Sequence, residues 1–125
     1  MSTILVVDDD ASHRTLICDI LQEMGYQTEE ASQGREALDI LEQRIPQAVL
    51  LDLRMPVMSG WALLEALKDL PSAQGLPIII ISGYGFEWEA ELVGASGYIS
   101  KPVDLDKVRE TVERIIGPPA VATVH

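Results

Sequence analysis

The sequence contains few cysteines, few basic residues and no long apolar runs. Its only cysteine is Cys18, so no disulfide can form within the 125 residues. Absence of disulfides is typical of a reducing compartment, and we expect a cytoplasmic protein. Cys18 falls inside an amphipathic helical pattern, which favours a buried thiol that packs as a small apolar side chain.

The scarcity of basic residues argues against one class of partner. Nine lysines and arginines stand against 20 aspartates and glutamates, and the formal net charge is −11. A protein that binds nucleic acid needs a basic surface to contact the phosphates. We therefore expect no direct nucleic-acid binding, so that any contact with DNA would come from another domain or partner.

The apolar runs are short. None approaches the ~20 residues that a membrane-spanning helix requires, and nothing resembles a signal peptide. Hydrophobic residues still make up 47% of the chain, which is typical of a globular domain rather than a disordered one. We expect one globular domain with no membrane contact.

Four apolar runs each stop at polar residues, in segments 6–10, 50–52, 80–82 and 98–102. Short runs of β-branched and aliphatic residues are typical of buried strands in a parallel sheet. Sheets of this kind bind ligands at the carboxyl ends of their strands, so these polar residues mark the expected site.

Strand and helix patterns alternate five times along the chain. We expect strands at residues 3–8, 26–31, 47–52, 78–82 and 97–100, and helices at residues 11–24, 33–44, 60–70, 86–93 and 105–116. Helices between short strands indicate right-handed crossovers and a sheet covered on both faces. The prediction is an α/β domain of the (βα)5 flavodoxin-like, three-layer type with strand order 2-1-3-4-5. Residues 1–117 would form it, and residues 118–125 a short loose tail or the start of a linker.

Several side chains mark the ends and faces of these helices. Ser32 and Asp104 are predicted N-caps, and Asp10 is interpreted as an acid at a helix N-terminus. The apolar spacing places Leu16 on the buried stripe of the first helix and Ile45 among the buried residues of the second.

The predicted strand order brings polar side chains together at one edge of the sheet. Strands one, three, four and five are neighbours in that order, and their ends carry Asp8, Asp9, Asp52, Ser82 and Lys101. Clustered carboxylates repel one another, whereas a divalent cation keeps them ionised. Oxygen ligands favour Mg²⁺, which is typically held by one or two carboxylates plus phosphate oxygens. An ionised Asp52 is then a candidate nucleophile toward phosphorus, with an aspartyl phosphate as its product.

These residues also carry a family resemblance. The blocks at residues 6–9, 52–56 with Gly60, 81–82 and 101–102 occur in the order found in the response-regulator receiver domain of two-component signal transduction, which the chain resembles over about residues 3–116. The resemblance implies a phosphorelay switch. A histidine kinase or phosphotransfer protein would donate a phosphoryl group to Asp52 with Mg²⁺ bound, and the domain would then change conformation to control a partner or output domain.

The resemblance also implies roles for single residues. Asp9 corresponds to a direct metal ligand, Asp8 to a mostly water-mediated one, and the backbone carbonyl of Arg54 to a third protein ligand beside the phosphoacceptor Asp52. Lys101 would pair with the phosphoryl group, and the peptide bond between Lys101 and Pro102 would be cis.

Two switch residues complete the implied set. Ser82 takes the place of the switch hydroxyl, which would donate a hydrogen bond to the phosphate, and Tyr98 that of the switch aromatic. Arg54 and Tyr84 occupy positions that flank the path of the hydrolytic water, and their bulk predicts slow self-dephosphorylation.

Partner surfaces are less directly implied. Ala11, His13 and Arg14 lie beside the acidic pocket and are candidates for docking the donor and setting kinase choice. The helix expected at residues 86–93 is nearly a turn shorter than is common in the family. That departure puts in doubt the family's homodimer through the face of helix four, strand five and helix five.

Three alternatives remain from the sequence. A phosphatase of the haloacid dehalogenase type would carry a second acid two positions after Asp52, where this chain has Arg54. A flavin module is disfavoured because Asp8, Asp9 and Asp10 offer anions where a phosphate-binding loop needs amides. The third is a receiver-like scaffold that phosphorylation does not regulate. We expect a switch that catalyses only its own phosphorylation and dephosphorylation, not an enzyme with a separate substrate.

Overall fold

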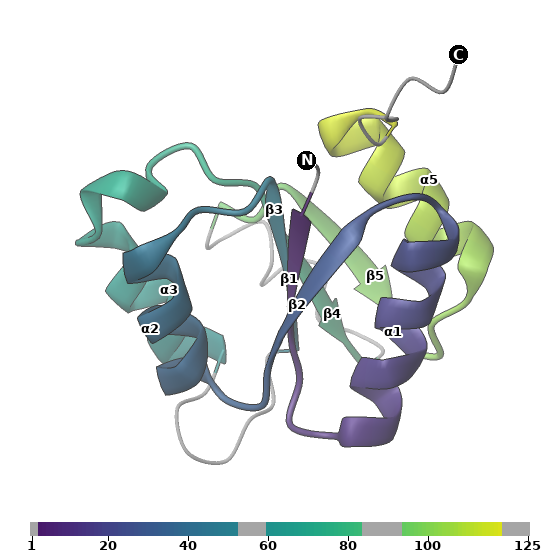
Figure 1. Ribbon diagram of the computed structural model, residues 1–125, viewed down its shortest axis with the longest axis horizontal. Helices are drawn as coiled ribbons and strands as arrows, with labels where there is room; N and C mark the ends of the chain where they lie inside the picture. The colour runs from purple at the N-terminus through teal and green to yellow at the C-terminus, as the bar shows by residue number, and fades with distance from the viewer. Residues whose placement is uncertain (1–2, 53–59, 84–93, 119–125) are drawn as a thin grey trace.

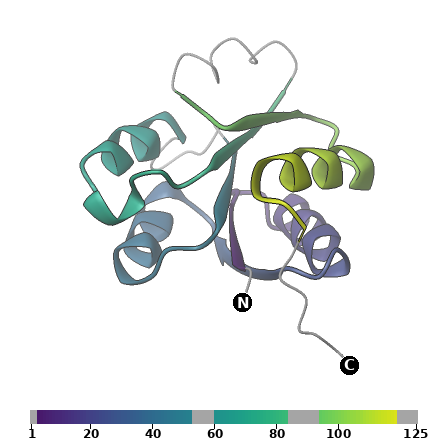
Figure 2. The same ribbon diagram turned by 90° about the horizontal axis from the view of Figure 1, so that it is seen from above.

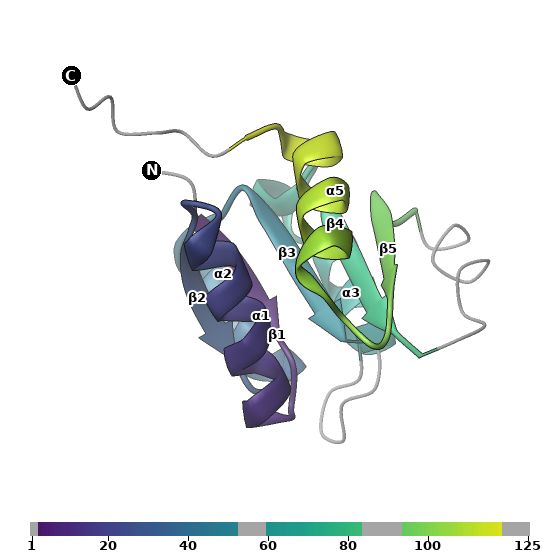
Figure 3. The ribbon, with the colours of Figure 1, turned by 90° about the vertical axis from the view of Figure 1, so that its right-hand side faces the viewer.

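The computed structural model describes residues 3–52, 60–83 and 94–118. Five parallel strands form one sheet in the order β2-β1-β3-β4-β5, as predicted. They are β1 (Thr3–Val7), β2 (Gln27–Ala31), β3 (Ala48–Asp52), β4 (Ile78–Ser82) and β5 (Gly97–Ser100). Figure 3 shows β1, β3 and β4 running side by side with their arrowheads toward one edge.

Helices cover both faces of this sheet (Figures 1 and 2). They are α1 (Ala11–Glu23), α2 (Gly34–Gln43), α3 (Gly60–Lys68) and α5 (Leu105–Ile116), with a short 3₁₀ helix η1 (Pro71–Ala73) after α3. In Figure 1, α2 and α3 lie to the left of the sheet and α1 and α5 to the right. The helix expected at residues 86–93 lies outside the described residues, as do residues 119–125 of the expected tail.

Alternation along the strands divides the core into two layers. In β1, Leu5 and Val7 pack with α2 and α3, whereas Ile4 and Val6 pack with α1 and α5. Successive strand residues point to opposite faces, so a strand covered on both sides must be apolar throughout. This is why β1, β3 and β4 are continuous apolar runs, while the edge strand β2 is more polar and partly exposed.

The ends of the helices agree in part with the sequence. Asp104 caps α5 by accepting a hydrogen bond from the Lys107 amide, and Gly117 ends that helix with a φ of 77°. Ser32 is not the N-cap of α2: Gln33 occupies that position, and its side chain makes no capping bond. The Ser32 amide instead donates a hydrogen bond to the carboxylate of Glu36 at 3.0 Å. The capping side chain at this end of α2 is therefore that of Glu36, which lies in the first turn of the helix.

Two predictions of burial were wrong. Leu16 is 45% exposed, because the centre of the buried stripe of α1 lies about a third of a turn away at 3.6 residues per turn. Ile45 is 41% exposed, because α2 ends at Gln43 and helical spacing does not apply beyond that residue. Cys18 is buried as expected, and burial raises the pKa of its thiol.

The far end of α5 is joined to the turn before β2. The hydroxyl of Tyr26, a side chain that is 3% exposed, donates to the backbone carbonyl of Gly117 at 2.6 Å.

Within the described residues, no helix combines the length and apolar character needed to span a membrane.

Candidate functional site

Three carboxylates meet where β1 and β3 end. Asp8 and Asp9 follow β1, and Asp52 is the last residue of β3. Val7 pairs with Leu51 in the parallel register, so the next step along each strand places Asp8 beside Asp52. Ligand oxygens of the three side chains lie within 4.8 Å of one another. The predicted acidic cluster is therefore present in the folded chain.

The cluster combines burial with an excess of negative charge. Asp8 is 1% and Asp52 3% exposed, whereas Asp9 is exposed. Lys101, which follows β5, donates from Nζ to Oδ2 of Asp52 at 3.2 Å. One ammonium group opposes three carboxylates, and all the candidate ligand atoms are oxygens. This donor set fits a hard divalent cation such as Mg²⁺ better than a zinc ion.

Ser82 lies at the end of β4 with its hydroxyl buried. The residue is 1% exposed, and Oγ has no hydrogen-bond partner among the described residues. A buried polar atom left in this state costs about 1–3 kcal/mol. Asp52 pairs with Ile81 in the register of β3 and β4, so Ser82 is one step beyond Asp52 at the same edge of the sheet. The unsatisfied hydroxyl is suited to a polar ligand there.

Tyr98 connects β5 to the segment after β4. Its hydroxyl donates to the backbone carbonyl of Gly83 at 2.5 Å, and its half-buried ring packs against the core layer of α2 and α3. The Lys101 amide donates to the carbonyl of Ser82 at 2.8 Å, which holds the two strand ends together. The bond between Lys101 and Pro102 is cis, as predicted.

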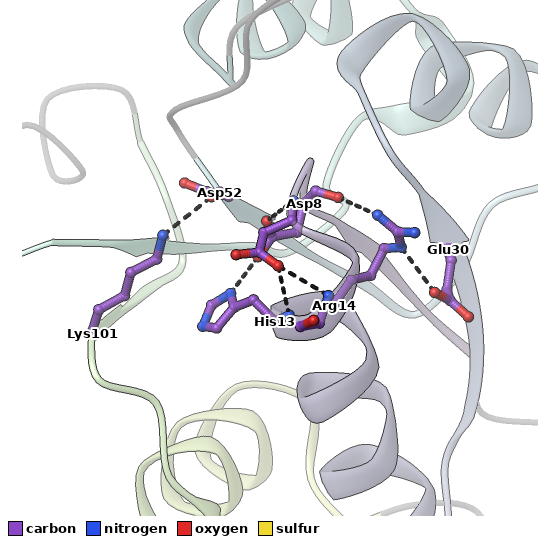
Figure 4. Close-up of polar contacts among 8 residues, drawn as sticks. Asp8, His13, Arg14, Glu30, Asp52 and Lys101 are labelled. Carbon is purple, nitrogen blue, oxygen red and sulfur yellow. Dashed lines mark hydrogen bonds and ion pairs between the residues drawn. The ribbon is translucent and has the colours of Figure 1, made fainter.

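Asp8 is held through its carboxylate and through its backbone (Figure 4). Its Oδ1 accepts a hydrogen bond from the Asp10 amide at 2.9 Å, and its Oδ2 contacts Nδ1 of His13. Arg14 donates from a terminal nitrogen to the Asp8 backbone carbonyl at 2.6 Å and from Nε to Glu30 at 2.9 Å. Both the carboxylate and the backbone of Asp8 are therefore fixed by neighbouring groups.

The contact between His13 and Asp8 was missed by the sequence analysis. A signal for it existed: Asp10 caps α1 by accepting from the amides of Ser12 and His13, as the interpretation of Asp10 as a helix-terminal acid implied. Helical side chains lean toward the N-terminus of their helix, so a side chain in the first turn of α1 reaches back toward the end of β1. Arg54 and Tyr84, with their predicted roles, lie outside the described residues.

Comparisons with known proteins place this chain in a family. The family model for the response regulator receiver domain matches residues 4–113. The chain belongs to this receiver-domain family, whose members are phosphorylation-based switches. The fold and family expected from the sequence are thereby confirmed.

Two curated relatives show how the domain is used. The chain is 39% identical to the transcriptional regulatory protein ZraR of Escherichia coli O157:H7 over 90% of its own length, but it spans only 26% of that protein. It is 34% identical to the sporulation initiation phosphotransferase F of Bacillus subtilis, spanning 90% of this chain and 92% of the relative. The same domain thus occurs both within a much longer protein and as nearly a whole one.

A solved structure adds a bound ion. The receiver domain of the sensor histidine kinase PA1611 from Pseudomonas aeruginosa matches with a TM-score of 0.85 and 25% identity, over 93% of this chain and 98% of that one. That structure holds a magnesium ion coordinated in its active-site cleft.

Proposed function

We propose that Asp52 accepts a phosphoryl group from a histidine kinase or phosphotransfer protein and that the resulting charge switches the conformation of this domain. The observation that carries the proposal is the convergence of three carboxylates within 4.8 Å, with Lys101 on Asp52 and an unsatisfied hydroxyl at Ser82. These are the groups needed to hold a cation, attack phosphorus and bind the product.

Asp8, Asp9 and Asp52 would hold Mg²⁺, together with the backbone carbonyl of Arg54. When bound, the ion neutralises the carboxylates and the phosphoryl oxygens as they approach each other. The all-oxygen donor set supports this assignment, as does the magnesium ion in the related PA1611 structure.

The transfer itself requires little from the protein beyond position and charge. A carboxylate oxygen of Asp52 forms a bond to phosphorus as the bond between phosphorus and the donor histidine nitrogen breaks, and the donor imidazole leaves as the electron pair returns to nitrogen. Lys101, already 3.2 Å from Asp52, pairs with a phosphoryl oxygen. Ser82 donates its hydroxyl proton in a hydrogen bond to another.

Switching follows from the same contacts. The segment after β4 is joined to β5 through Tyr98 and to the site through Ser82. A phosphoryl group that binds the Ser82 hydroxyl therefore acts on the end of β4, to which Tyr98 is joined, and favours one of two conformations of the domain. We also propose that the domain catalyses only its own modification and turns over no separate substrate. We propose the cytoplasm as its location.

The donor would dock beside α1. Ala11 is exposed next to the acidic cluster, while His13 and Arg14 are 19% and 17% exposed and already contact Asp8. Ala11 is therefore the most accessible of the three docking candidates. The homodimer through the face of helix four, strand five and helix five stays a prediction, because helix four, expected at residues 86–93, lies outside the described residues.

Labelling with a radioactive phosphodonor tests the central assignment. We expect wild-type protein to take up label in the presence of MgCl₂, and Asp52→Asn to take up none because it lacks the nucleophile. Asp69→Asn, which neutralises an exposed acid just beyond α3, is the matched control and should label normally. Magnesium-dependent label on Asp52→Asn would overturn the assignment of Asp52 as the phosphoacceptor, whereas wild-type protein that takes up no label would favour the scaffold that phosphorylation does not regulate.

A further inference from the structure

We propose that His13 is a positioning residue that orients the Asp8 carboxylate and thereby sets the Mg²⁺ affinity of the acidic cluster. This inference rests on the proposed function, because it concerns the same metal site. It assigns His13 a role inside the site in place of the role in donor docking that its position on the first helix suggested.

The geometry of Asp8 carries the inference. This carboxylate is 1% exposed, and within the described part of the chain each of its oxygens has one partner: the Asp10 amide on Oδ1 and the His13 ring on Oδ2. Two donors on two different oxygens fix both the position of the carboxylate and its rotation. His13 is itself only 19% exposed, since its ring is turned toward Asp8 rather than toward solvent (Figure 4).

The chemistry of the pair fixes the direction of the hydrogen bond. An ionised carboxylate can only accept hydrogen bonds, so Nδ1 of His13 carries a hydrogen and donates the hydrogen bond to Asp8. The Arg14 guanidinium meanwhile holds the backbone carbonyl of Asp8 at 2.6 Å and is held in turn by Glu30. The carboxylate, its main chain and the first turn of α1 are thus connected in one network.

This arrangement is compatible with a bound ion. A carboxylate offers about four lone-pair sites, and the two contacts on Asp8 use about half of them. The others remain for the ion or for its water molecules. The contact from His13 therefore persists when the site is loaded, and its loss leaves Asp8 free to turn away from the position that serves the ion.

Titration of MgCl₂ into the protein by calorimetry measures the predicted effect. Loss of a hydrogen bond from a neighbouring group to a metal-binding side chain typically weakens metal binding by about 10–100-fold, and we expect His13→Ala to lie near the lower end, with Kd raised roughly tenfold. His13→Leu fills the space of the ring without supplying a donor, and it should raise Kd by the same factor. It takes the place of His13→Ala in this test if the alanine variant does not fold.

Two further variants separate positioning from general damage. The Nδ2 amide of asparagine occupies the place of the histidine Nδ1 along the side chain and can donate the same hydrogen bond. The Kd of His13→Asn for Mg²⁺ should therefore lie within about threefold of the wild-type value, a smaller rise than the roughly tenfold expected for His13→Ala. Thr15→Ala changes an exposed residue of the same helix and should bind Mg²⁺ as wild type does. Melting curves in chelator show that each variant is folded before titration.

A small-molecule phosphodonor separates positioning from docking. If His13 only docks a protein donor, His13→Ala will bind Mg²⁺ normally and will label normally from acetyl phosphate, and the inference is wrong. If it positions Asp8, labelling from acetyl phosphate will be slow at low MgCl₂ and will recover as MgCl₂ is raised. Tighter binding of Mg²⁺ by His13→Ala would also overturn the inference, since it would mean that the ring competes with the ion.

Failure of this inference is distinguishable from failure of the proposed function. Asp9→Asn removes a candidate ligand and should weaken Mg²⁺ binding whatever His13 does. Wild-type protein that does not bind Mg²⁺ would overturn both proposals. Weak binding by Asp9→Asn together with normal binding by His13→Ala would overturn only the role of His13.

Discussion

The carboxyl ends of β1 and β4 flank β3 in one sheet, yet the polar side chains at these ends have opposite surroundings. Asp8, after β1, is held through both carboxylate oxygens and through its backbone carbonyl. Ser82, the last residue of β4, is equally buried but its hydroxyl has no partner among the described residues. The end that would hold a cation is thus complete in the folded chain, whereas the end that would sense a phosphoryl group is not.

This difference matches what each end has to do. A metal site gains affinity when its ligands are fixed before the ion arrives, because no free energy is then used to order them. A switch needs an element whose arrangement depends on the ligand, and an unsatisfied hydroxyl supplies such a dependence. Substitutions at the two ends should therefore change the free energy of unfolding in opposite directions.

The largest effect is expected at the complete end. Arg14→Ala removes a charged donor from the Asp8 carbonyl and from Glu30, and it should lower the free energy of unfolding by about 2 kcal/mol. Urea denaturation in chelator measures this value. Arg14→Lys keeps the charge but loses the planar guanidinium that reaches both Asp8 and Glu30, so its free energy of unfolding should lie between those of Arg14→Ala and wild type. A loss below about 0.5 kcal/mol for Arg14→Ala, the size of a typical exposed pair, would mean that the end of β1 is no better held than the surface.

The incomplete end should respond with the opposite sign. Ser82→Ala removes a buried hydroxyl that makes no bond, and it should raise the free energy of unfolding by up to about 1 kcal/mol in unphosphorylated protein. The same urea titrations measure it. A clear loss of stability would show that the hydroxyl is satisfied in solution, and the contrast between the two ends would disappear.

The smallest effect is expected at Tyr98. Tyr98→Phe deletes the bond to the Gly83 carbonyl, but this half-buried position leaves water able to replace it, so the loss should be about 0.5 kcal/mol. Tyr26→Phe is the matched control, because the Tyr26 hydroxyl is more deeply buried and donates to Gly117, and its loss should be about 1 kcal/mol. A larger loss at position 98 than at position 26 would place Tyr98 among the fixed elements of the fold.

The sequence predicted the sheet and the acidic cluster because both depend on local patterns. A buried parallel strand must be apolar along its whole length, and the residue where that run stops marks the ligand edge, which located Asp8, Asp52 and Ser82. The contact of His13 with Asp8 depends instead on the rotamer of one ring in the first turn of a helix, and spacing alone does not specify it. Leu16 and Ile45 were misplaced for other reasons: Leu16 lies away from the centre of the buried stripe of α1, and Ile45 lies beyond the end of α2, where helical periodicity no longer applies.

The bond between Tyr26 and Gly117 has a mechanical consequence. It joins positions 91 residues apart in the sequence, so the last turn of α5 is tied to the turn between α1 and β2 as well as to its own helix. A force applied to the end of α5 is therefore shared between two elements. Under load, this helix would begin to unravel only after the phenol had released the carbonyl.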